Sequence, residues 1–537
     1  MNDFLAQIPI FLVFIPVVFS IIIYLFKAKW TTYLSFVSQV LLLIAFFAYL
    51  SFWRLHPGDH LLVFGGWSER IGISFFHDGL SLTFSFLAIF IFSVILMYLF
   101  KFRRKDHKFF FFFLFLEGIF LGMIQTNDLF NMFVFLELTT VLVTVLISYQ
   151  KSGPSFQAGI YYLLLNTVGA LFFLIGIVFL YNVFGTINIR VLQELIGTQG
   201  DRTVVKFAYV IMMSGISVKA ALFPLFTWLP KAHGVAQSGI SALLSGLVVK
   251  GALYVLIRME RFLFVEAGFH MNELFFWIGV VTAIVGVTFA ISQKDMKQIL
   301  AYHTVSQVGI MMMGISQIGL TPFYGGVLHI INHALFKSLL FLGAGILIKH
   351  YQTKKVYEIK GALKTFPIVA VMLIIAMLSI SGAPLFNGFV SKSMIKYAVK
   401  GNFIKEALFF LINLGTVTSF IKFSSVLFGP KAILVKEKNP LQIISIIVLG
   451  LSCLGIGLFY QVIASSIFGI TISTNLWEIS HFLDYGLFLV IGFLFYRFVV
   501  KKDYLPFQKI RHFKLTFESA NYMFVVYLLV VLGVVFL

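Results

Sequence analysis

The sequence predicts an all-α protein that crosses a membrane many times. Of its 537 residues, 60% are hydrophobic and only 11% are charged, and the apolar residues form long runs along the whole chain. A run of about 20 apolar residues is the length that a helix needs to cross a bilayer. Windows of that length place roughly 16 spans in the chain. No stretch has the composition of a water-soluble domain.

The expected spans follow one another with short connections. Residues 1–26 lack the basic start and the small-residue cleavage site of a signal peptide, so they are expected to remain as the first span. The spans begin near residues 4, 31, 76, 108, 129, 156, 205, 238, 272, 298, 322, 365, 403, 441, 481 and 518.

Alternate loops differ in charge, which predicts the orientation of the chain. The formal net charge is +19, and most of it lies in one set of loops. Cytoplasmic loops are rich in Lys and Arg, so we expect these loops in the cytoplasm of a prokaryotic cell and both termini outside the plasma membrane. Orientation explains the charge without a nucleic-acid partner. The basic loops lie at 27–29, 101–108, 151, 294–297, 349–364, 431–438 and 501–514.

The composition excludes several kinds of chemistry. The single cysteine, Cys453, rules out disulfides within the chain, thiolate metal sites and iron–sulfur ligation. The chain has no Gly-rich phosphate loop with a following lysine, so it is not expected to hydrolyse ATP. We therefore expect no cofactor, no metal and no enzymatic activity of its own, and we expect an ion gradient or a partner to supply energy.

Two lysines in apolar surroundings are the first candidates for function. Lys219 and Lys250 each lie near the middle of an expected span, where a charge costs about 2.5–3.5 kcal/mol on insertion scales. Pro224 follows Lys219 by five residues and predicts a break in that helix. The alternative is that both lysines reach toward a membrane surface, but both are far from the expected span ends. A buried lysine beside an opened backbone favours proton or ion movement.

Acidic residues in the preceding spans are the natural partners of these lysines. Glu137 lies near the middle of its span, and a pair with Lys219 would lower the cost of burying both charges. A static salt bridge that fixes packing is the alternative. Glu117, one span earlier, is a second carboxylate at membrane depth that is expected to modulate the pair.

A second polar group is expected later in the chain. His329, His333 and Lys337 are spaced by four residues, so they share one face of a helix. A histidine pair at this spacing could bind zinc, but the adjacent ammonium opposes a cation. A proton path suits histidine better because it titrates near neutral pH, and plain polar packing is the remaining alternative.

The other candidate residues lie near a second expected break and near the cytoplasmic ends of spans. Lys392 lies eight residues after Pro384, so the second break also has a lysine beside it. His233 and His303 lie nearer the cytoplasmic ends and are expected to modulate transport. The scarcity of buried carboxylates favours protons over sodium inside this chain.

Two further stretches are expected to have no role in transport. The run Phe109–Phe113 is expected to face lipid. Asp295 and Lys297 are expected to form a solvated cytoplasmic turn.

The order of the spans indicates an inverted repeat. Two sets of five spans each contain one broken helix, and an odd number of spans per unit makes the second copy inverted, as in secondary transporters. Incidental breaks are the alternative, because Pro and Gly are common in membrane helices. The expected divisions are 1–107, the repeats 108–260 and 272–428, and the C-terminal helices 429–537.

Six sequence blocks between about residues 70 and 430 resemble the antiporter-like subunits shared by respiratory complex I, membrane-bound hydrogenases and Mrp-type multisubunit Na+/H+ antiporters. Lysine at position 392 makes the chain most similar to the Mrp D subunit. The blocks are DLFNMFVFLE, FPLFTWLPKAH, SALLSGLVVK, DMKQILAYHTVSQVG, HIINHALFKSLLFLGAG and SGAPLFNGFVSK.

The resemblance implies a core of about 14 helices with two inverted five-helix repeats, and the chain has about two helices beyond it. It also implies residue roles. Glu137 and Lys219 would gate the proton, Lys250 would relay it, and Lys392 would pass it outward. His329, His333 and Lys337 would carry the proton from Lys250 to Lys392.

The resemblance implies a proton-translocating subunit of a multisubunit Na+/H+ antiporter, working with other membrane subunits in a bilayer. The alternative is a proton-pumping subunit of a complex I-like NADH dehydrogenase or a membrane-bound hydrogenase, again without a redox centre of its own. A subunit that energises bicarbonate uptake would use the same residues.

Overall fold

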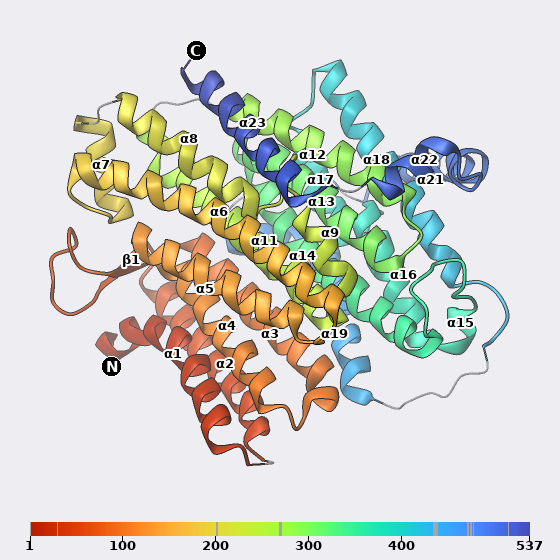
Figure 1. Ribbon diagram of the computed structural model, residues 1–537, viewed down its shortest axis with the longest axis horizontal. Helices are drawn as coiled ribbons and strands as arrows, with labels where there is room; N and C mark the ends of the chain where they lie inside the picture. Colours follow the sequence, from red (N-terminus) through yellow and green to blue (C-terminus); the bar gives the residue numbers. More distant parts are fainter. Residues whose placement is uncertain are drawn as a thin grey trace. The chain divides into compact units, whose positions relative to one another are not determined.

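The fold is built almost entirely of helices (Figure 1). The computed structural model describes residues 2–28, 30–199, 202–267, 271–432, 439–469, 472, 475, 477–513 and 515–536. By its internal contacts the chain forms two compact units. Unit 1 comprises residues 1–220, 247–270 and 521–537, and unit 2 comprises residues 221–246 and 271–520.

Unit 1 contains the N-terminal helices, and acidic or hydroxyl residues begin several of them. Asp78, Asp106, Asp128 and Ser152 each accept a hydrogen bond from a backbone N–H in the first turn that follows, which satisfies a donor without a helical partner. The helices are α1 (Asn2–Phe26), α2 (Leu34–Leu55), α3 (Gly79–Arg103), α4 (His107–Gln125), α5 (Leu129–Ser148), α6 (Gly153–Phe184), α7 (Ile189–Gln199), α8 (Arg202–Lys219), α11 (Val249–Arg258) and most of α23 (Phe517–Phe536).

A short antiparallel hairpin precedes α3 in unit 1. Strand β1 (His60–Val63) pairs with β2 (Ser74–His77), with His60 opposite His77 and Val63 opposite Ser74. The hairpin places the N-cap residue Asp78 directly after β2. It therefore fixes where α3 begins.

Unit 2 contains the later helices and both short helices around residue 235. The sequence Leu244–Val248 is a π-helical turn that links α10 to α11. The helices are α9 (Trp228–Val235), α10 (Ser238–Leu243), α12 (Asn272–Ser292), α13 (Met296–Ile315), α14 (Leu320–Tyr351), α15 (Ala362–Thr365), α16 (Pro367–Ser381), α17 (Asn387–Lys396), α18 (Phe403–Phe423), α19 (Pro440–Leu458), α20 (Tyr460–Phe468), α21 (Ile479–Phe495) and α22 (Leu505–His512).

The helices confirm the expected spans. Among the described residues, thirteen helices are long and apolar enough to cross a membrane. Three further expected spans, α8, α13 and α16, are helical but fall short of that length or hydropathy. Every expected span start lies within about three residues of a helix start, as period and length arguments allow.

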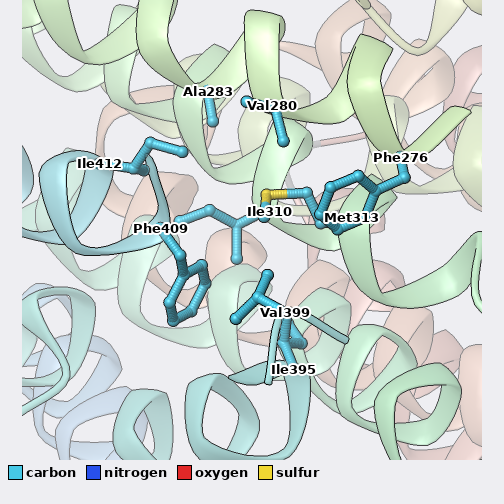
Figure 2. Packing of buried hydrophobic residues seen from close by; sticks show 9 residues of the cluster. All are labelled: Phe276, Val280, Ala283, Ile310, Met313, Ile395, Val399, Phe409 and Ile412. Atoms are coloured by element: carbon cyan, nitrogen blue, oxygen red, sulfur yellow. The ribbon is translucent and has the colours of Figure 1, made fainter. Parts of the chain in front are cut away.

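Close backbone contacts hold neighbouring helices together. A Cβ on Gly215 in α8 would lie 2.3 Å from the carbonyl oxygen of Gly169 in α6, and one on Gly309 in α13 would lie 2.4 Å from that of Gly279 in α12. Only glycine permits such approaches. In unit 2 the contact continues into an apolar cluster that joins α12, α13, α17 and α18 (Figure 2).

Two expectations about local environment are wrong. Phe109, Phe110 and Phe113 are fully buried rather than lipid-facing, because α4 is covered by α1, α3 and α5. Lys297 is also buried, and its Nζ donates to the carbonyl oxygen of Ala236 over 2.6 Å, so it is not part of a solvated turn. In both cases the tertiary neighbours decide which face is covered.

Candidate functional site

A buried ion pair joins α5 to the end of α8. Lys219 Nζ lies 3.1 Å from Glu137 Oε1, and it also donates to Thr140 Oγ1 over 2.7 Å. Thr167 on α6 donates to the other carboxylate oxygen, Oε2, over 3.1 Å. The lysine side chain is 7% exposed and the glutamate 23%. The structure thus brings together the two residues that the sequence paired.

Lys219 is the last residue of α8, and the helix stops there. The chain is not helical again until Trp228, so the break spans the expected residue Pro224. The last carbonyl groups of a helix carry partial negative charge, which favours a cation at this end. The ammonium is therefore held by a carboxylate, a hydroxyl and the helix terminus. If one of these partners is lost, the others still stabilise it.

Lys250 is the second residue of α11, which directly follows the π-helical turn Leu244–Val248. Its side chain is fully buried. The helix lies close to α4, because a Cβ on Gly251 would meet Met123 Cε at 2.6 Å. π-helical turns are frequent at functional sites. The structure therefore places Lys250 at depth, as expected from the sequence.

The polar residues of unit 2 lie on α14 and α17. One ring nitrogen of His329, Nδ1, lies 2.9 Å from Ser391 Oγ, and the other, Nε2, lies 3.1 Å from Gln307 Oε1. The rings of His329 and His333 have centroids 6.5 Å apart. Histidines with hydrogen-bonded nitrogens on both sides can receive and release protons.

Two lysines of unit 2 donate to backbone carbonyl groups. Lys337 Nζ donates to Leu300 over 2.7 Å, and Lys392 Nζ donates to Ile380 over 2.7 Å. Lys392 is 6% exposed and lies beside Gly382, where the chain leaves α16. The break between α16 and α17 spans residues 382–386 and includes Pro384. Both lysine side chains are therefore buried, and each donates to a backbone carbonyl oxygen.

The residues expected to modulate transport are more deeply placed than the sequence indicated. His233 is fully buried and stacks on Phe341, with ring centroids 4.7 Å apart, and Lys337 Nζ lies 5.9 Å from the same ring. His303 is also fully buried, against Phe420. Both belong to the interior of unit 2.

Glu117 belongs to a separate polar group in unit 1. Gln39 Nε2 donates to its Oε2 over 2.6 Å, and Ser93 Oγ donates to Gln39 Oε1 over 2.6 Å. The carboxyl group is fully buried between α2, α3 and α4. Its hydrogen-bond partner among the described residues is Gln39 rather than a member of the Glu137–Lys219 pair, so its modulating role stays a prediction.

Sequence reasoning missed the hydroxyl and amide partners. Thr140, Thr167, Gln307 and Ser391 each bond a candidate residue. Thr140 lies about one helical turn after Glu137, so helical spacing alone could have indicated this partner. The others come from different helices, so only the fold places them. Within the described ranges, no group of three or more His, Cys, Asp or Glu side chains could hold a metal ion.

The chain is similar to known proteins in sequence and in fold. Residues 126–422, more than half of the chain, match the family described as NADH:quinone oxidoreductase/Mrp antiporter, transmembrane. The putative antiporter subunit mnhD2 of Staphylococcus aureus strain N315 is 31% identical over 377 residues, which are 69% of this chain and 75% of the relative.

Two solved structures share the fold. A chain of the Mrp complex from Dietzia sp. DQ12-45-1b has a TM-score of 0.78 at 20% identity, covering 95% of this chain and 99% of that one. A chain of the membrane-bound sulfane sulfur reductase, an archaeal respiratory membrane complex, has a TM-score of 0.78 at 24% identity, covering 91% and 99%.

Proposed function

Because the chain belongs to the NADH:quinone oxidoreductase/Mrp antiporter family, we propose that it translocates protons as a membrane subunit of a multisubunit cation/proton antiporter. The observation that carries the proposal is the buried pair of Glu137 and Lys219 at a helix break. A buried pair contributes little net stability compared with apolar residues. A pair that opens and closes during transport gives these two charges a function.

In the proposed path, the pair sets the proton affinity of Lys219. When Glu137 moves away, the ammonium loses its opposite charge and releases its proton more readily. Lys250 receives it next. His329, His333, Lys337 and Lys392 carry it through unit 2, with Glu117, His233 and His303 modulating. This path accounts for several lysines buried among apolar residues, which a purely structural role would not require.

The proposal includes the organisation of the chain and its surroundings. Residues 108–260 and 272–428 form the two inverted repeats, each with one helix broken near a lysine. The basic loops lie in the cytoplasm, and the termini lie outside a prokaryotic plasma membrane. The partners are other membrane subunits, as in the complexes with the same fold, and sodium is the cation exchanged by the whole complex.

The alternative is a pumping subunit of a redox-driven complex. It is favoured by the shared fold with the sulfane sulfur reductase complex, at 24% identity. The antiporter function is favoured by a relative of higher sequence identity, the S. aureus subunit at 31%. The buried residues serve both functions in the same way.

Charge removal at the pair tests the proposal. Glu137→Ala and Lys219→Ala should abolish coupled cation/proton exchange in vesicles, and Lys250→Ala should be at least as damaging, while the complex still assembles. Lys206→Ala is the matched control, because Lys206 lies on the same helix and its Nζ lies 5.5 Å from the Phe536 ring, outside the Glu137–Lys219 pair. Exchange at the wild-type rate in an assembled pair variant would refute the gating role.

A further inference from the structure

A row of polar side chains leads from Lys250 toward one end of α11. Lys250, Tyr254 and Arg258 are spaced by four residues, so they lie on one face of the helix and rise by about 6 Å per step. Arg258 Nε donates to Tyr254 Oη over 2.8 Å, and Tyr254 Oη donates to the carbonyl oxygen of Ile124 over 2.5 Å. The row ends at a guanidinium group.

Arg258 is closed off by a bidentate ion pair. Its Nη1 and Nη2 each lie 2.7 Å from an oxygen of Asp78, and both residues are buried. Asp78 is also the N-cap of α3 and accepts from the Ser81 N–H over 2.8 Å. Burial raises the pKa of Asp78, but Arg258 and Ser81 outweigh burial and hold that pKa below its usual value. The pair therefore stays charged across physiological pH.

A cavity of about 590 Å³ lies on the far side of this pair. Arg258 and Phe76 line it together with Asp59, Asn127 and residues of α7. It lies at the N-terminal end of α3, whereas the basic residue Arg103 ends the same helix. The cavity is therefore at the opposite end of unit 1 from the basic loop 101–108.

The lining of the cavity is polar. Its charged side chains balance, with Asp59 and Glu194 against Arg190 and Arg258, and Thr, Asn and Gln side chains add neutral polar groups. A cavity that is polar and roomy enough holds water. A guanidinium does not release its proton in proteins, so Arg258 acts as a barrier rather than as a relay.

We infer that this cavity is an aqueous vestibule, and that the Asp78–Arg258 pair is the gate between the vestibule and Lys250. The inference rests on the proposed function in taking Lys250 as a relay. With the pair closed, water reaches Arg258 and no further. With Arg258 displaced, the polar face of α11 connects Lys250 to the medium on the side opposite the basic loops.

Thiol labelling in the assembled complex tests the gate. In a Cys453→Ser background, Thr198→Cys reports on the vestibule, because Thr198 lines it and is exposed. Ser85→Cys reports below the gate, because buried Ser85 lies seven residues, about 10 Å, along α3 from Asp78. The probes are membrane-impermeant cationic and anionic methanethiosulfonates, applied to right-side-out and inside-out vesicles.

We expect Thr198→Cys to react from the side opposite the basic loops, with the cationic and the anionic reagent alike. Ser85→Cys should be protected in the parent chain. Its labelling should rise at least about tenfold with Arg258→Gln. The double variant Asp78→Asn/Arg258→Gln should do the same, since Asn keeps the N-cap.

The matched control is Arg190→Gln, which removes a positive charge from the same cavity but not from the pair. Ser85→Cys should stay protected there. The gate is refuted if Ser85→Cys stays protected in both gate variants of an intact complex. The vestibule is refuted if Thr198→Cys reacts only from the basic-loop side. Labelling needs no transport, so normal exchange in the Lys219 variants would refute the proposed function alone.

Discussion

At the scale of single residues, the position of the Lys219 ammonium depends on its neutral partner as much as on its charged one. The bond to Thr140 Oγ1 is 2.7 Å, shorter than the 3.1 Å contact with Glu137. Hydrogen bonds to charged groups contribute about 1.5–3 kcal/mol. In the proposed open state of the pair, Thr140 would therefore keep the ammonium in position.

Replacement of that hydroxyl should slow coupled exchange. Thr140→Val keeps the shape but removes the acceptor, and we expect a loss of about tenfold in exchange rate. Thr140→Ser should restore most of it. The control is Thr139→Val, because Thr139 is buried on the next position of α5 and its hydroxyl bonds none of the described residues. Equal effects of both valine variants would show that Thr140 acts only through packing.

At the scale of elements, the helices that carry the candidate residues are aligned by backbone contact. The crossing of α12 and α13 at Gly279 and Gly309 leaves no room for a side chain. The interior of a protein is too closely packed to absorb an added methyl group without a shift.

Gly309→Ala should therefore destabilise unit 2. A Cβ would lie 2.4 Å from Ala283 N. We expect the free energy of unfolding to fall by about 1–3 kcal/mol, which would be measured as a lower Tm in detergent. Gly455→Ala on α19 is the control, since a Cβ there meets nothing within 4 Å. A similar Tm for both variants would contradict the close crossing.

A charged staple holds α22 to the end of α12. Asp503 lies 2.6 Å from Lys294 Nζ and also bonds Arg511, whose Nε donates to the Ser292 carbonyl oxygen over 2.7 Å. The Arg511 and Lys294 contacts outweigh desolvation and lower the pKa of Asp503 from 3.8 to about 2. The folded chain thus releases this proton more readily than the unfolded chain.

The staple should persist at mildly acidic pH. A carboxylate with a lowered pKa stabilises the fold above its ordinary pKa, and that contribution is lost only as the pH falls from about 4 toward 2. Asp503→Asn should raise hydrogen exchange in residues 505–513 about fivefold at pH 7. Asp484→Asn, at an exposed position on α21, should leave it unchanged. Lost protection in the wild type already at pH 5 would count against the staple.

Features that depend on neighbouring residues can be predicted from the sequence, whereas contacts between residues far apart in the chain are known only from the fold. Span starts and the depth of Lys250 follow from local hydropathy and helix length. The partners Gln307 and Ser391 lie on other helices than His329, so no local pattern points to them. The same limit explains the buried phenylalanines of α4, because helix spacing does not reveal which faces other helices cover.

At the scale of the whole molecule, the chain is a multi-pass membrane protein of an antiporter family, and the proposed function requires partner subunits. Purification from the native membrane in mild detergent should yield several small hydrophobic subunits without flavin or iron–sulfur absorbance. Co-purifying redox subunits with that absorbance would make the chain a redox-driven pump instead. Mass spectrometry of the purified chains decides between the two.

The ion pair at the end of α8 also has a consequence for how the chain enters the membrane during synthesis. Helix α8 is not among the helices that qualify as spans by length and composition, and it ends in a lysine. Its neutralising carboxylate is on α5, which is made earlier and is apolar enough to insert on its own. Insertion of α8 is thus favoured by a neighbour that is already in place, so the order of synthesis supplies the partner before the charge arrives.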